Sequence, residues 1–126
     1  MQKYKMYIDG EYVVSASGKW FDSYNPDTGE PWAQIAQGNA EDADRAVRAA
    51  HKAYTEGPWP QLTPSQRGLL LHKLGDLVAR DARKLAEAEV RDNGKLIAEM
   101  QGQLNYIPQC YYYSGEARAE FALVKP

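Results

Sequence analysis

Residues 63–95 read TPSQRGLLLHKLGDLVARDARKLAEAEVRDNGK, and this stretch decides the fold because it holds a long helix together with both of its ends. Thr63 and Gln66 form the pattern of a capping box, in which each side chain satisfies the backbone amide of the other residue. Pro64 falls at the first helical position, where a missing N–H costs no hydrogen bond. These residues predict where the helix begins.

The interior of the same stretch is amphipathic. Asn93-Gly94 supplies the left-handed residue that ends a helix, so we expect a helix over residues 63–93. An alternative is two helices joined near residues 79–81, with Asp81 as the second N-cap. Apolar residues recur at three- and four-residue spacing and predict a face that docks on another element: Leu70, Leu74, Leu77, Val78, Leu85 and Ala86.

Composition limits the function classes. The 126 residues suffice for one small domain, and a net charge of -2 gives no electrostatic footprint for nucleic acid or acidic membranes. Neither an apolar run of membrane-spanning length nor a signal-peptide core is visible, and a lone cysteine cannot form an internal disulfide. We therefore expect a cytoplasmic protein without nucleic-acid or membrane partners.

The N-terminal part predicts β-structure. Asp9-Gly10 favours a type I′ turn between short apolar segments at residues 6–8 and 12–14. A strand over residues 20–24 and a second one over 31–36 flank a proline- and glycine-containing turn. We expect an antiparallel hairpin and meander over residues 1–37 that carries no chemistry of its own.

Two further helices complete the prediction. Asn39 caps a helix over residues 39–55, with a narrow buried stripe formed by Ala43, Ala46, Val47, Ala50 and Tyr54. A loop with Trp59 as a packed plug precedes the central helix. A last helix over residues 97–120 contains Pro108, which predicts a kink or a break between residues 106 and 109. One face of this helix combines Tyr106, Cys110, Tyr113 and Ala117.

Collinear motifs resemble the N-terminal segment of the aldehyde dehydrogenase family. Residues 89–95, EVRDNGK, match its "E-x-x-D-N-G-K" signature, and residues 25–30, NPDTGE, match its "N-P-x-T-G-E" turn. The opening hairpin at residues 7–13, the GPW at 57–59 and the run at 67–74 follow in the family's order. The resemblance implies an α+β fragment of the α/β aldehyde dehydrogenase fold, a hairpin and meander followed by three or four helices, without a complete Rossmann unit. It makes residues 1–126 a single N-terminal segment.

The same resemblance implies the chemistry of a parent enzyme. Such an enzyme oxidises an aldehyde to a carboxylic acid through a thiohemiacetal and hydride transfer to NAD or NADP, which requires a thiolate, oxyanion donors, a general base and a dinucleotide site. In the family these groups lie beyond the matched part, and no glycine-rich phosphate turn follows a predicted strand here. We expect this chain alone to contain no catalytic or cofactor-binding residue, to bind no coenzyme and to be inactive.

Cys110 is the one candidate nucleophile. Gln109 directly precedes it, whereas the family's nucleophile lies in a "G-Q-x-C" context on a loop, and Cys110 lies in a helical pattern with no basic residue within a turn to activate the thiol. We favour a buried packing cysteine. His51 and His72 are isolated on polar helix faces and are expected to be solvated, so no zinc site is predicted.

Two sets of site residues follow from the resemblance. Several family members hold a monovalent cation, whose ligands by position are Asp92, Ser23 and Tyr24; a hard cation suits such oxygens, and the set is incomplete without the remaining family ligand. The alternative for Asp92 is an acidic but solvated helix surface with Glu87, Glu89 and Glu99. The mouth of the substrate tunnel falls by position on Asn105, Tyr106 and Gln109. Pro108 and Leu96 depart from the family pattern in this region.

The expected partners are the remainder of a dehydrogenase or full-length subunits, and self-association is a further option. The alternative function is a non-enzymatic interaction module, or a short paralogue that binds partner subunits, acting through the tyrosine-rich helix around residues 111–113. The sequence leaves open the aldehyde, the choice of NAD or NADP and the oligomeric state. It also leaves open whether the end at Pro126 is natural.

Overall fold

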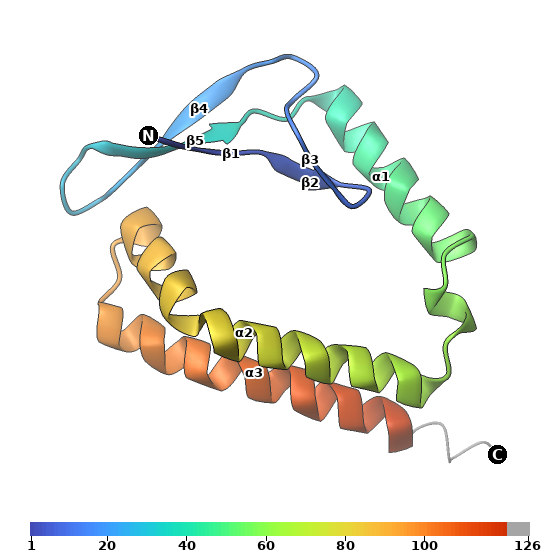
Figure 1. Ribbon diagram of the computed structural model, residues 1–126. Coiled ribbons are helices and arrows are strands. Elements are labelled where there is room, and N and C mark those ends of the chain that lie inside the picture. Colours follow the sequence, from blue (N-terminus) through green and yellow to red (C-terminus); the bar gives the residue numbers. More distant parts are fainter. Residues whose placement is uncertain (121–126) are drawn as a thin grey trace. The chain divides into compact units, whose positions relative to one another are not determined.

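The computed structural model describes residues 1–120, with side chains described through residue 116 (Figure 1). Five strands precede all of the helices: β1 (Gln2–Tyr4), β2 (Met6–Ile8), β3 (Glu11–Val13), β4 (Trp20–Tyr24) and β5 (Pro31–Ala36). Then follow α1 (Ala40–Thr55), a 3-10 turn η1 (Trp59–Gln61), α2 (Pro64–Asn93) and α3 (Ile97–Glu120). The chain divides into two compact units, Met1–Pro60 and a second one that begins at Gln61.

The β2–β3 hairpin confirms the prediction from Asp9-Gly10. Asp9 has a φ of 53° and Gly10 a φ of 81°, and two positive φ values at the central residues define a type I′ turn. Met6 pairs with Val13 and Ile8 with Glu11. The handed twist of this turn matches that of the strands, so the local sequence alone fixes the hairpin.

The remaining β-structure departs from the predicted antiparallel meander in one strand, β1. β4 and β5 pair antiparallel as expected, but β1 pairs parallel with β5, from Gln2 opposite Ala33 to Tyr4 opposite Ile35, giving a separate sheet of order β1-β5-β4. All three residues of β1 are exposed. A strand without a buried face carries no side-chain pattern that specifies its partner, so the sequence could not predict this pairing.

α1 begins as predicted and packs differently. The Asn39 side chain accepts a hydrogen bond from the Asp42 amide at 3.0 Å, and Asp42 reciprocates at the Asn39 amide at 3.1 Å. The expected buried stripe is wrong, because Val47 is 68% exposed and Tyr54 74% exposed. The β2–β3 hairpin lies along Ala46 and Ala49 and is too narrow to cover the whole stripe.

α2 is one continuous helix. Thr63 and Gln66 form the predicted capping box, and Gly94 ends the helix with a φ of 73°. The alternative of two helices is wrong. Asp81 lies inside α2 and binds the Arg80 guanidinium through both carboxylate oxygens, at 3.0 and 2.7 Å, so it caps no helix start.

α3 likewise continues through Pro108 as one helix, so the break that was one of the two expected outcomes is wrong. Pro108 is buried. Its carbonyl oxygen faces α2, since a Cβ built on Gly75 would be only 3.1 Å from it. Packing against α2 therefore offsets the hydrogen bond that the proline ring removes.

α2 and α3 pack through small residues, side by side along their length (Figure 1). A Cβ added to Gly68 would lie 2.6 Å from the Gly115 carbonyl oxygen, and one added to Gly75 would lie 2.5 Å from Cε1 of Tyr112. Only glycine permits approaches this close. Farther along the pair, the buried core consists of Ala86, Met100 and Leu104, with Ala82, Val90 and Ile107 packed against it.

The predicted docking face of α2 therefore meets α3 only in part, through Ala86. Of its six residues Ala86 is buried and Val78 is partly buried. The other four remain substantially exposed: Leu70 46%, Leu74 41%, Leu77 39% and Leu85 39%. Glycine and alanine let the helix backbones come closer than leucine would, so the small-residue face forms the interface.

Candidate functional site

The predicted cation ligands fall on both units. Ser23 and Tyr24 lie at the end of β4, where the pairing with β5 shifts register between them. Such an irregularity re-aims backbone groups next to it. Asp92 lies in the last turn of α2 and is exposed. The structure thus shows the position of each predicted ligand within its own unit. A cation site formed by all three residues stays a prediction.

The acidic residues around Asp92 belong to a helix surface. Glu87 pairs with Arg83 at 3.0 Å, and Glu89 accepts a hydrogen bond from the Asn93 side chain at 2.6 Å. Among the side chains that the structure describes, those of residues 1–116, no group of three or more His, Cys, Asp or Glu is arranged to hold a metal ion.

The predicted tunnel residues share one exposed side of α3. Asn105, Tyr106 and Gln109 are all exposed, and Tyr106 is 66% exposed. Leu104 and Pro108 are buried on the side toward α2. The three side chains therefore lie on the side of α3 that faces away from α2, and their role at a substrate tunnel stays a prediction.

Cys110 lies on this same outward side and is exposed, so the expectation of a buried packing cysteine is wrong. The small-residue packing of α2 selects Leu104, Pro108 and Gly115 as the inward positions of α3, which turns Cys110 outward. The thiol lies in the middle of a regular helix rather than on a loop.

His72 also differs from its prediction, whereas His51 is exposed as expected. The His72 ring is partly buried and lies 5.4 Å from the Tyr112 ring at an interplanar angle of 52°. It packs between the two helices next to Gly115. Its surroundings are aromatic and backbone groups, which is typical of a packing role.

Tyr112 completes this contact between helices, which the sequence did not reveal. Its hydroxyl donates a hydrogen bond to Oδ1 of Asp76 at 2.8 Å. This hydrogen bond to the carboxylate raises the pKa of the Tyr112 phenol, with burial as a second cause. The tyrosine run thus stabilises the helix pair through Tyr112, while Tyr113 is 65% exposed.

Asp42 of the first unit accepts several hydrogen bonds, and this hydrogen-bond network was not predicted from the sequence. Only 3% exposed, it accepts hydrogen bonds from the Ser15 hydroxyl at 2.7 Å, from the Ala16 amide at 3.0 Å and from the Asn39 amide at 3.1 Å. The Ser15 hydrogen bond is the main reason that the pKa of Asp42 is lowered. The N-x-x-D spacing after Asn39 was the available signal.

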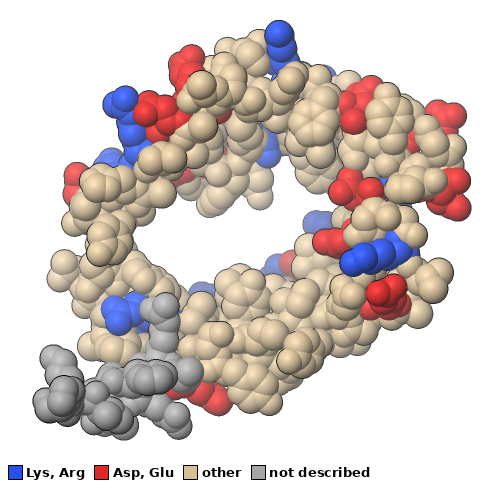
Figure 2. Space-filling model, turned by 180° about the vertical axis from the view of Figure 1, so that it is seen from behind, with Lys and Arg blue, Asp and Glu red and all other residues tan. Residues whose placement is uncertain are grey.

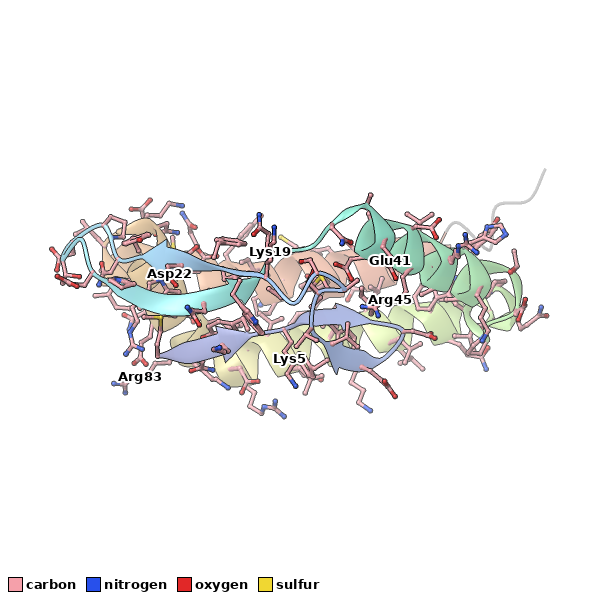
Figure 3. All side chains as sticks on the ribbon, turned by 90° about the horizontal axis from the view of Figure 1, so that it is seen from above. Lys5, Lys19, Asp22, Glu41, Arg45 and Arg83 are labelled. Carbon is pink, nitrogen blue, oxygen red and sulfur yellow. The ribbon has the colours of Figure 1, made fainter. Side chains whose placement is uncertain are left out.

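A groove of about 560 Å³ lies between the β2–β3 hairpin and α1. The hairpin contributes Asp9 and Glu11, and α1 contributes Arg45 and Arg48. Arg48 is already paired with Asp44 at 2.7 Å. Figure 3 shows Glu41 and Arg45 on α1, beside the hairpin. Charges of both signs line the groove, so its charge favours neither an anionic nor a cationic ligand.

The surface of the protein also carries charges of both signs. On the face shown in Figure 2, Lys and Arg side chains are interspersed with Asp and Glu, and neither sign forms a large continuous field. No helix within residues 1–120 is long and apolar enough to cross a membrane.

Comparisons with known proteins identify the family. The sequence model of the aldehyde dehydrogenase family matches residues 12–122. A (Z)-2-((N-methylformamido)methylene)-5-hydroxybutyrolactone dehydrogenase of Acinetobacter baylyi is 44% identical over 118 residues, covering 93% of this chain and 24% of the relative. A mitochondrial aldehyde dehydrogenase of Rattus norvegicus is 41% identical over 116 residues, covering 90% of this chain and 22% of the relative.

The fold agrees with these matches. The crystal structure of an NAD-dependent aldehyde dehydrogenase from Sinorhizobium meliloti superimposes with a TM-score of 0.89 at 35% identity, covering 94% of this chain and 24% of that one. The chain thus spans about a quarter of the length of the relatives that it matches. With its strands followed by helices and its collinear motifs, the chain belongs to the aldehyde dehydrogenase family, of which it forms an N-terminal segment.

Proposed function

We propose that this chain is the N-terminal part of an NAD(P)-dependent aldehyde dehydrogenase that oxidises an aldehyde to a carboxylic acid. The observation that carries the proposal is the superposition on the NAD-dependent enzyme of Sinorhizobium meliloti, together with the family match over residues 12–122. The chain would contribute a rigid helix pair and its outward polar residues to the larger enzyme. NAD or NADP would serve as hydride acceptor.

Residues 1–120, which the structure describes, do not fit a dinucleotide site by themselves. A pyrophosphate site needs a strand, a glycine-rich turn and a helix whose first amides are free. β5 and α1 are the one consecutive strand and helix within residues 1–120, and only Gly38 lies in their short connection. The Asp42 carboxylate accepts from the Asn39 amide at the start of α1 and would repel phosphate. We therefore place the coenzyme on the remainder of the enzyme.

The catalytic groups are assigned to that remainder as well. A nucleophilic thiolate needs a group that lowers its pKa and a nearby oxyanion site. Cys110, the one cysteine of the sequence, is exposed in the middle of α3 instead. We infer that the isolated chain turns over no aldehyde. A cytoplasmic location, expected from the composition, stays a prediction.

A chimera tests the proposal. In this chimera, the present 126 residues replace the matched quarter of the Sinorhizobium meliloti enzyme, so both parts remain in one chain. We expect aldehyde-dependent formation of NADH by the chimera and none by the purified 126-residue chain. A folded chimera without activity would contradict the proposed role, and reproducible turnover by the isolated chain would contradict its inactivity.

One observation favours the alternative of a non-enzymatic interaction module. Tyr106 and Tyr113 are 66% and 65% exposed on one side of α3, as a partner-binding aromatic surface would be. Under this alternative, the 126-residue chain would be a stable monomer that melts cooperatively. It would bind a partner without restoring any dehydrogenase activity.

A further inference from the structure

α2 is apolar on two nearly opposite sides. Gly68 and Gly75 face α3, whereas Leu70 and Leu77 each lie two residues farther along. At about 100° of rotation per residue, this spacing places the leucines about 160° around the helix from the glycines. One side is already covered by α3, and the other side is not.

The side of α2 turned away from Gly68 and Gly75 carries a row of leucines. We call Leu70, Leu74, Leu77 and Leu85 the leucine face; all four are between 39% and 46% exposed. It extends over about 22 Å at 1.5 Å per residue. Asp81 lies among these leucines, where it is ion-paired with Arg80 at 2.7 and 3.0 Å, and Lys84 lies close to it. A surface of this size on a helix marks a place for another layer of structure.

The relatives indicate what that layer is. The chain covers 24% of the Sinorhizobium meliloti enzyme and superimposes on it with a TM-score of 0.89, so an equivalent of α2 there belongs to a chain about four times as long. A helix that is apolar on opposite sides is typical of the interior of a larger protein. In an enzyme of that length, the remaining three quarters of the same chain are the structure available to cover the exposed side of this helix.

We infer that the leucine face is the docking surface for the remaining three quarters of a dehydrogenase, and that the exposed tyrosines of α3 are not. This inference rests on the proposed function and adds to it the surface through which the segment joins the enzyme. Leu69 provides a matched control. It lies on the same helix and is 69% exposed, but it is rotated by about 100° from Leu70 and lies outside the leucine face.

The test supplies the two parts as separate chains. The tagged 126-residue chain is co-expressed with the Sinorhizobium meliloti enzyme lacking the matched quarter, and co-purification is quantified. We expect Leu74→Asp and Leu77→Asp each to reduce the co-purified enzyme about tenfold or more, because a carboxylate would be buried without a partner. Leu69→Asp and Tyr113→Ser should leave the amount unchanged.

Controls keep the outcomes separate. Circular dichroism of each isolated variant should match that of the native chain, since all of these side chains are already exposed. Equal losses for Leu69→Asp and Leu77→Asp, no co-purification of the native chain, or a homodimer in sedimentation that Leu77→Asp abolishes would each overturn the inference. An active single-chain chimera together with no effect of Leu77→Asp on co-purification would refute the docking surface while leaving the proposed function intact.

Discussion

The carboxylate of Asp42 links the start of α1 to the loop at residues 15–16. It caps its own helix by binding the Asn39 amide, and it fixes the preceding loop by binding Ser15 and the Ala16 amide. All of these partners donate hydrogen bonds, so they stabilise the charged form of the side chain. The folded-state pKa of Asp42 is consequently lowered below its ordinary value of 3.8.

A pH dependence of stability follows from this shift. A lowered folded-state pKa means that the contribution of Asp42 is present above about pH 4 and is lost as the pH falls through the folded-state value. We expect Asp42→Asn to lower the melting temperature at neutral pH and to flatten the loss of stability between neutral and acidic pH. Thermal melts of both proteins at a series of pH values measure this.

Asp44→Asn is the matched control, because Asp44 is an exposed residue of the same helix whose ion pair with Arg48 is on the surface. Surface pairs of this kind contribute little to stability. An acid dependence that is identical in the native protein and in Asp42→Asn would show that other carboxylates govern it.

At the scale of elements, the contact between α2 and α3 depends on where glycine is required. Gly75 faces Tyr112 and the Pro108 carbonyl, and a Cβ there has no room. Gly102 of α3 is also helical, but nothing lies within 4 Å of the position that its Cβ would take. The same residue type therefore has opposite roles at these two positions.

Substitution by alanine should change the free energy of unfolding in opposite directions at Gly75 and at Gly102. Gly75→Ala gains helix propensity but forces the helices apart, and we expect a net loss of about 1–3 kcal/mol in the free energy of unfolding. Gly102→Ala should gain up to about 1 kcal/mol because only the propensity changes. Urea unfolding followed by circular dichroism measures both; a stabilising Gly75→Ala would contradict the close approach of the helices.

At the scale of the whole molecule, two units have separate internal packing. All three tryptophans, Trp20, Trp32 and Trp59, belong to the first unit, and the second unit contains none. The long helices α2 and α3 belong to the second. Tryptophan emission and far-ultraviolet circular dichroism therefore report mainly on different units.

Met100→Ala should separate the two signals. Met100 is 2% exposed in the core between α2 and α3, and its truncation is expected to cost about 2–5 kcal/mol. We expect the circular dichroism transition to move to lower temperature by a larger amount than the transition in tryptophan emission. Coincident shifts of both transitions would show instead that the units unfold as one cooperative body.

The sequence by itself determined the elements with local signals. Thr63, Gln66 and Gly94 set the ends of α2, and Asp9-Gly10 set the hairpin turn, because caps and tight turns are decided by neighbours within a few residues. The collinear motifs, among them those at residues 25–30 and 89–95, also predicted the family correctly.

Tertiary structure alone decided which faces meet. Leucine periodicity predicted the apolar side of α2, but the close fit of Gly75 against Tyr112 selected the small-residue side for α3 and left the leucines open. The parallel pairing of β1 and the unbroken course of α3 through Pro108 were likewise decided by contacts distant in sequence. Periodicity gives the polarity of a surface, whereas the choice of partner depends on the shape of both sides, which no single helix encodes.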